Sequence, residues 1–127
     1  ADLTQRANER ADYCRWLFFA AGPVEQAITA RSFKFEPRPE QQGMAGWGSF
    51  ERTMKTLEGH LAGTQWVCGS RFTMADVYVG SAVDWGLTFG SIPPEVAFVA
   101  YAERFQARDA YKAAKAIDNA LIEKMRK

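Results

Sequence analysis

The stretch that decides the fold is residues 66–77, which read WVCGSRFTMADV. Its second half has the pattern of a helix start, because Thr73 can accept a hydrogen bond from the amide of Asp76 while the Asp76 carboxylate accepts one from the amide of Thr73. Such a reciprocal pair is a capping box, and packing of Phe72 against Val77 would add a hydrophobic staple. The pattern therefore predicts a helix whose N-cap is Thr73.

The segment that follows this start, from Val77 to Leu87, carries a single charged side chain, Asp84. A helix that is apolar on most sides must be covered on most sides, so we expect a buried central helix here. Gly80 and its small neighbours would let another part of the fold approach closely. Two interpretations of Asp84 stay open: a solvated or paired carboxylate, or a residue that lines a ligand cleft.

A long helix is expected before the quoted stretch, from about Leu3 to Ala30, with Asp2 or Thr4 as its N-cap. Pro23 lies inside this segment. It should kink the helix, because proline has no amide hydrogen to donate and its ring crowds the preceding turn.

The centre of this first helix is apolar on every side, because residues 16–19 read WLFF. A stripe centred on Phe18 is expected to face the core, since its other members fall within about 60° of Phe18 on a helical wheel. Those members are Leu3, Ala7, Ala11, Cys14 and Ala21. The apolar surface left around Trp16 and Phe19 then implies a partner: another domain, another subunit or a ligand.

Three further helices complete the predicted bundle. Residues 42–62 have a clean apolar face of Trp47, Phe50, Met54, Leu57 and Leu61. A helix with Pro94 at its first position should pack through Val96, Val99, Ala100 and Phe105. Asp109 is expected to cap a fifth helix that ends near Ile117, before a frayed tail. The sequence therefore predicts one all-α domain over residues 1–127, a five-helix or six-helix bundle with a kinked first helix.

The composition excludes several classes of protein. The 127 residues include 16 Lys and Arg against 15 Asp and Glu, a formal net charge of +1, which excludes the broad basic field that nucleic-acid binding needs. We expect neither a membrane span nor a signal peptide, because no apolar run is long enough and the amino terminus is polar. The first residue is Ala1 rather than Met, so the natural protein is expected to start further upstream.

The chain offers little chemistry. Two cysteines and one histidine are too few for a zinc site, so no metal is expected, and free thiols suggest a reducing compartment, the cytoplasm. His60 is expected at the solvated flank of its helix, Cys14 in the core and Cys68 in a structural role near a loop. Phosphate-binding loops and the common hydrolase motifs are absent from the sequence.

Residues 66–76 resemble the signature that leads into the central helix of the glutathione S-transferase carboxy-terminal domain. That signature is an aromatic or aliphatic pair, Gly, a polar residue, a large apolar residue, Thr, any residue, Ala and Asp. The segments YCRWLFFA at 13–20 and YAERF at 101–105 are also similar to the family, so the resemblance covers nearly the whole chain. It implies the helical domain of a bacterial-type member, with Thr73 and Asp76 as the family's folding cap.

The resemblance also implies what the chain lacks. Family members begin with a thioredoxin-like domain that binds glutathione and supplies a catalytic Ser, Tyr or Cys, and this sequence contains neither that domain nor its cis-Pro loop. Cys14 and Cys68 do not match the family's catalytic cysteine. We therefore expect no catalytic residue and no cofactor in this chain, with glutathione a co-substrate of the full-length protein.

Site residues follow from the resemblance one at a time. The family's hydrophobic substrate site uses the first and central helices, which implies substrate contacts from Trp16, Phe19, Pro23, Gln26 and Trp85. The alternative for Trp16 and Phe19 is packing against the missing domain or a second subunit. Family members are usually dimers, and this would place Tyr13 and Leu17 near the interface.

Two functions remain in competition, beside a third interpretation in which the chain is a degenerate family member with a structural role. The first is the substrate-binding domain of a glutathione S-transferase that conjugates glutathione to hydrophobic electrophiles, in which case the isolated chain should be inactive. The alternative is a non-catalytic protein–protein interaction module with the same helical fold.

Overall fold

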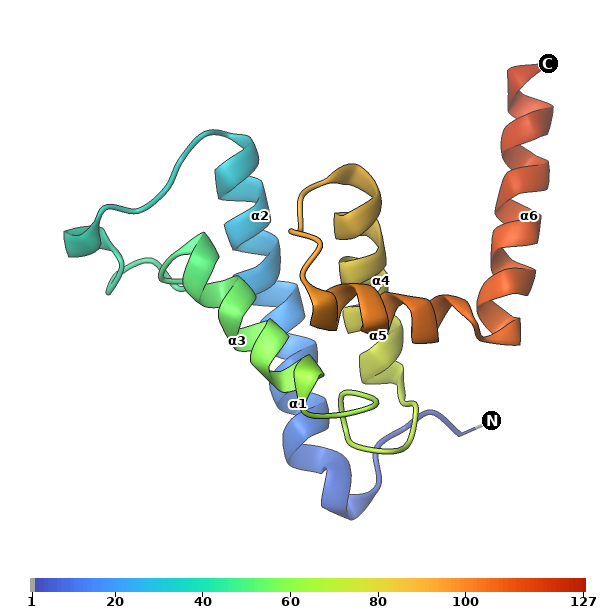
Figure 1. The fold of residues 1–127 in the computed structure, drawn as a ribbon, viewed down its shortest axis with the longest axis horizontal. Helices are drawn as coiled ribbons and strands as arrows, with labels where there is room; N and C mark the ends of the chain where they lie inside the picture. The colour runs from blue at the N-terminus through green and yellow to red at the C-terminus, as the bar shows by residue number, and fades with distance from the viewer. Residues whose placement is uncertain (1) are drawn as a thin grey trace.

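The computed structural model describes residues 2–127, and helices make up its regular structure (Figure 1). The α-helices are α1 (Arg10–Phe19), α2 (Glu25–Ser32), α3 (Phe50–Ala62), α4 (Met74–Phe89), α5 (Val96–Gln106) and α6 (Asp109–Arg126). Shorter helical segments are η1 (Ala7–Glu9), η2 (Ala20–Val24) and η3 (Pro39–Gln41). The predicted all-α fold is therefore confirmed. Within the described range no helix combines the length and apolarity that crossing a membrane requires.

The first helix is interrupted where the sequence predicted a kink. Segments α1, η2 and α2 follow one another directly, and η2 is a π-helical stretch that contains Pro23. The wider π turn accommodates the proline, which cannot donate the usual backbone hydrogen bond. The predicted start at Leu3 was wrong, because the first helical residue is Ala7. Residues before it run along the loop that precedes α4, where the Met74 amide donates to the Leu3 carbonyl at 2.8 Å.

The core face of the first helix is not the predicted one. Phe18, the centre of the expected stripe, is 70% exposed, whereas Trp16 is 3% exposed. The buried side consists of Trp16, Ala20, Val24 and Ala27. With apolar residues all round its centre, this helix carries no directional pattern, so its neighbours decide which side is buried. The small alanines of this side let α3 and α4 pack closely against it.

Helix α3 begins later than predicted. Residues 42–49 form turns, since they include three glycines, and Gly48 has a φ of 74°. Ser49 is the N-cap, and its hydroxyl accepts a hydrogen bond from the amide of Arg52 at 3.1 Å. The predicted apolar face from Phe50 onward is buried, which confirms the amphipathic interpretation of this segment.

Helix α4 is the buried central helix, as predicted. Thr73 and Asp76 form the capping box at its start. The Asp76 carboxylate accepts hydrogen bonds from the amide of Thr73 at 3.0 Å, the amide of Val67 at 2.8 Å and the hydroxyl of Tyr101 at 2.8 Å. Burial raises the pKa of this carboxyl above its ordinary value. The cap therefore ties α4 both to the preceding loop and to α5.

Phe72 belongs to an aromatic cluster rather than to a simple staple. Its ring lies edge-on to Trp66, with centroids 4.9 Å apart, and stacks on Phe105 at 6.4 Å. Val77, its predicted partner, is half-buried and lines the groove described below. The close approach predicted at Gly80 is confirmed, because a Cβ atom there would overlap the Phe105 ring.

Helices α5 and α6 differ from the prediction in detail. Helix α5 starts at Val96 with Glu95 as its N-cap, so Pro94 lies just before the helix. Its buried residues are Phe98, Tyr101, Ala102 and Phe105, whereas Val96 is 85% exposed. Helix α6 is continuous to Arg126, so the tail is not frayed, and it stands clear of the rest of the domain (Figure 1).

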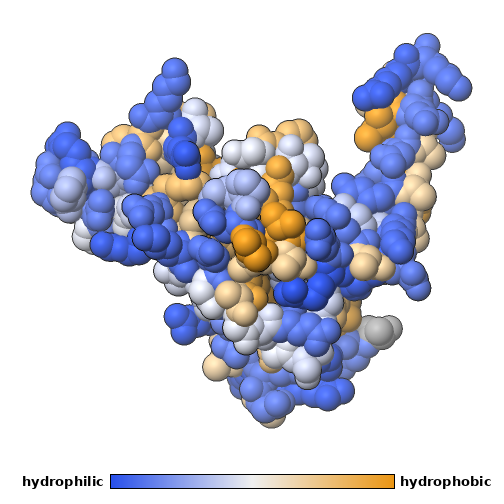
Figure 2. Space-filling view, viewed as in Figure 1, coloured by the Kyte–Doolittle hydropathy of each residue, from blue (hydrophilic) through white to orange (hydrophobic). Residues whose placement is uncertain are grey.

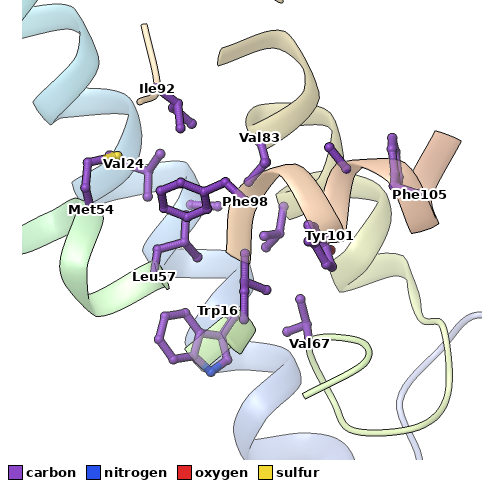
Figure 3. Close-up of a cluster of buried hydrophobic side chains, with 14 of the residues drawn as sticks. Trp16, Val24, Met54, Leu57, Val67, Val83, Ile92, Phe98, Tyr101 and Phe105 are labelled. Carbon is purple, nitrogen blue, oxygen red and sulfur yellow. The ribbon is translucent and has the colours of Figure 1, made fainter. Parts of the chain in front are cut away.

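The core lies where α5 crosses α4 beside α3. Phe98 points from α5 toward Val24 and Leu57, and Val83 of α4 belongs to the same cluster (Figure 3). Phe98, Val83 and Leu57 are each at most 1% exposed. This core fixes the relative positions of the first helix and α4, the two elements that form the groove described below.

A partly buried ion pair that the sequence did not predict joins the start of the chain to the loop before α4. The Arg71 guanidinium donates to both carboxylate oxygens of Glu9, at 2.9 and 2.5 Å, and also to the carbonyls of Asp2 and Thr4. These bonds, with one from the amide of Arg6, lower the pKa of Glu9 to about 2.

This ion pair predicts an acid-sensitive contribution to stability. Because the folded pKa of Glu9 is lowered from 4.5 to about 2, the contribution is complete above pH 4.5 and is lost as the pH falls toward 2. Urea unfolding at several pH values should therefore show that Glu9→Gln loses less stability than the wild type over this window. Equal losses in the two proteins would contradict this role of the ion pair.

Candidate functional site

An apolar groove runs between the first helix and α4. Its volume is about 640 Å³. One wall consists of Tyr13, Leu17, Ala20, Val24, Glu25, Ile28 and Thr29. The other wall consists of Met74, Val77, Tyr78, Ser81, Ala82, Trp85, Gly86, Phe89 and Ser91. Most of these lining residues are apolar, and the others carry hydroxyl groups apart from Glu25.

The helical repeat explains the shape of the groove. On the first helix the wall residues recur every three or four positions, and on α4 the stripe from Met74 through Tyr78, Ser81 and Trp85 to Phe89 does the same. Small residues, Ala20, Ala82 and Gly86, also line the groove, and Gly86 has to be small because a Cβ atom there would overlap Ile92. Large side chains stand along the rim.

The rim of the α4 wall is unusually apolar for exposed surface. Trp85 is 60% exposed and Phe89 is 70% exposed, and their rings lie 4.9 Å apart between centroids. Tyr78 and Met74 on the same stripe are also exposed. A contiguous exposed apolar patch of this kind marks a ligand or partner site.

The predicted substrate residues are only partly brought together. Trp85 lines the groove, whereas Trp16 does not. Trp16 belongs to the core beneath Leu57 (Figure 3), stacked on the His60 ring at 4.1 Å. Its assignment to the substrate site is therefore corrected, because a side chain that is 97% covered by the fold has no surface left for a ligand. The cause is the wrong choice of core face on the first helix.

The other predicted residues lie outside the groove. Phe19 packs edge-on against Trp16 at 5.2 Å, Pro23 is half-buried inside η2, and Gln26 faces the backbone of Gly46 in the loop before α3. The groove wall instead uses Tyr13 and Leu17, which the sequence analysis had placed near a subunit interface. The residues of this wall recur every three to four positions from Tyr13 to Ile28, and this spacing was the sequence signal that could have predicted the wall.

His60 is also not the solvated side chain that the sequence predicted. Its Nε2 lies 2.7 Å from the carbonyl oxygen of Val67, and its ring is half-buried against Trp16. This pair links the end of α3 to the loop before α4. Its role is structural, since the ring faces the core and not the groove.

Comparison with protein families identifies the domain. The family model described as Glutathione S-transferase, C-terminal domain, matches residues 9–85. The chain belongs to this family. The matched range runs from α1 to Trp85 in α4, so it includes the first-helix wall of the groove and most of the α4 wall. Neither the comparison with curated proteins nor the one with solved structures gave a significant match.

In this glutathione S-transferase domain, Asp84 is paired, and it also borders a second hollow. Its carboxylate accepts hydrogen bonds from the Gln106 amide at 2.5 Å and from the Tyr111 hydroxyl at 2.7 Å. Burial, followed by this hydrogen bond, raises the pKa of Tyr111 to about 12. The paired interpretation of Asp84 is therefore confirmed, because its carboxylate holds α5 and α6 to α4, and it also lines the hollow beside them.

The groove of this glutathione S-transferase domain is suited to binding rather than to acid–base or nucleophilic chemistry. Neither cysteine is among the groove residues, and burial raises the pKa of the Cys68 thiol, which disfavours the reactive thiolate. In residues 2–127 we find no group of three or more His, Cys, Asp or Glu placed to hold a metal ion. The polar groups at the groove are hydroxyls and a single carboxylate, which can orient a ligand.

Proposed function

We propose that this domain is the substrate-binding half of a glutathione S-transferase, and that its groove holds the apolar electrophile to which glutathione is conjugated. The observation that carries the proposal is the groove itself, about 640 Å³ between the first helix and α4, within a domain of this family. This volume lies in the range typical of small-molecule sites.

The groove residues indicate which part of the reaction each of the two domains would perform. A thioredoxin-like domain would bind glutathione and lower the pKa of its thiol, so that the thiolate forms a bond to the electrophilic carbon and the leaving group departs with its electron pair. The helical domain would hold that carbon within reach, which is catalysis by positioning. The 127-residue chain mixed with glutathione and 1-chloro-2,4-dinitrobenzene should therefore show only the uncatalysed rate.

The prediction for the groove concerns an uncharged fluorescent dye, N-phenyl-1-naphthylamine. We expect the 127-residue chain to bind it, and Trp85→Ala to weaken binding about tenfold, because a large aromatic contact in the site is lost. A fluorescence titration of the wild type and the variant measures both dissociation constants.

Phe18→Ala is the matched control. Phe18 is 70% exposed, comparable to Trp85 at 60%, and it lies outside the groove. The control should bind the dye as the wild type does. If the wild type fails to bind the dye, or if the two variants lose affinity equally, the groove is not the apolar ligand site.

We also propose, from the family resemblance, that the full-length protein is a cytoplasmic homodimer. Tyr13 and Leu17 line the proposed substrate groove, so a dimer that leaves the groove open cannot be built on these two residues. Analytical ultracentrifugation of the full-length protein with and without the dye tests this point: a dimer that the dye does not dissociate has its interface elsewhere, whereas one that the dye dissociates uses the groove.

A second function, a protein–protein interaction module, is favoured by one observation on α6. Ile117, Leu121 and Met125 form an exposed stripe along this helix, at 70%, 58% and 79% exposure. Figure 2 shows apolar residues on α6 where it stands clear of the domain. Replacing these three residues with Ser should leave dye binding in the groove unchanged. This variant therefore separates a function of the α6 surface from ligand binding in the groove.

A further inference from the structure

The groove carries a single formal charge, and that charge is negative. Among the described residues that line it, Glu25 is the one acidic side chain, and no lysine, arginine or histidine lines it. Hydroxyl groups of Tyr13, Thr29, Tyr78 and others supply the remaining polar surface. An amphiphilic ligand with a negative group would therefore meet a carboxylate with no cation to offset it.

Glu25 is not neutralised by the chain, as far as the described residues extend. The ion pairs found there use other acidic residues: Glu9, Glu40 and Glu51. The helix neighbours three and four positions from Glu25 are Ala21, Gly22, Ile28 and Thr29, none of which is a cation. The carboxylate is exposed, so it can receive a charged partner from outside.

Two aromatic rings lie toward the same end of the groove. The first helix and α4 run in the same general direction (Figure 1), so Glu25, at the start of α2, lies toward the end of the groove that Trp85 and Phe89 occupy. Their rings are exposed and 4.9 Å apart between centroids. Aromatic faces attract cations, and tryptophan does so most strongly.

We propose that the groove prefers small apolar molecules with a positively charged group, such as aryl ammonium compounds, with the cation held at the Glu25, Trp85 and Phe89 end. The apolar part lies along the groove toward Tyr13. The charge complementarity comes from the lone carboxylate, and the aromatic rings reinforce it. This inference rests on the proposed function, because it names the substrate class of the same groove.

A matched series of ligands tests the preference. The three compounds share one ring system: (1-naphthylmethyl)trimethylammonium, 1-naphthylmethanol and 1-naphthylacetate. Each displaces N-phenyl-1-naphthylamine from the 127-residue chain, and the inhibition constants are compared. We expect the cation to bind about fivefold more tightly than the alcohol, and the anion to bind more weakly than the alcohol. The advantage of the cation should shrink when salt is raised from 0.05 to about 0.5 M.

In the variant Glu25→Gln the cation should bind only about twofold more tightly than the alcohol, because only the aromatic rings still favour it. The control Glu123→Gln, at an exposed position of α6, should keep the wild-type ratio of the two affinities. If the dye binds but the three ligands bind equally, or the anion binds best, the charge preference is overturned while the apolar site stands. If Glu25→Gln leaves the ratio unchanged, the carboxylate has no part in it and the proposal falls. If the dye itself does not bind, the proposed function fails and this inference fails with it.

Discussion

Replacing Asp76 with alanine is expected to lower the free energy of unfolding by about 3–5 kcal/mol. The carboxylate is 0% exposed and accepts three hydrogen bonds, from the amides of Val67 and Thr73 and the hydroxyl of Tyr101. All three donors come from residues that are fully buried or nearly so, at no more than 1% exposure. Removing the acceptor leaves them without a partner in the interior, which costs more than the bonds themselves contribute.

Urea unfolding monitored by circular dichroism measures this loss. Asp118→Ala, at an exposed position of α6, is the control and should change stability by less than about 0.5 kcal/mol. Should Asp76→Ala prove too unstable to purify, Asp76→Asn keeps one acceptor oxygen and should show a smaller loss. A midpoint equal to that of the wild type in either Asp76 variant would contradict the role of this carboxylate.

Truncation of Trp16 to alanine is expected to cost about 3–5 kcal/mol, which is typical of a buried aromatic side chain. Its indole is 3% exposed, stacks on His60 and packs edge-on against Phe19. Phe18→Ala, two residues further along the same helix, removes a ring that is 70% exposed and should cost less than about 1 kcal/mol.

The comparison of these two variants decides which side of the first helix is the core. Thermal or urea unfolding of both variants is sufficient, because the test depends only on which variant loses more stability. A larger loss for Phe18→Ala than for Trp16→Ala would restore the core stripe that the sequence predicted and contradict the structure.

The start of the central helix could be predicted residue by residue, because local hydrogen bonding determines it. Thr73 and Asp76 are three positions apart, and a capping box depends only on that spacing and on the residue types. The same holds for the effect of Pro23, which acts through its own missing amide hydrogen. These features need no knowledge of distant parts of the chain.

The face of the first helix and the groove could not be predicted in this way, because they depend on contacts between distant residues. The WLFF segment at 16–19 is apolar on every side, so the sequence does not distinguish the side that meets α3 from the side that forms the groove. The pair of Glu9 and Arg71 joins residues 62 positions apart, and no local pattern signals it. Trp85 was predicted from the family resemblance, whereas Tyr13 and Leu17, on the opposite wall of the groove, were expected near a subunit interface because the sequence does not show how the first helix packs on α4.

The central claim is that the groove between the first helix and α4 binds apolar ligands. Four tryptophans give four indole N–H signals in a nitrogen–proton correlation spectrum, and Trp85 alone of these lines the groove. Titration with 1-naphthylmethanol should shift the indole signal of Trp85 and leave those of Trp16, Trp47 and Trp66 in place. A shift of the Trp16 signal with that of Trp85 unmoved, or no shift at all, would contradict the account.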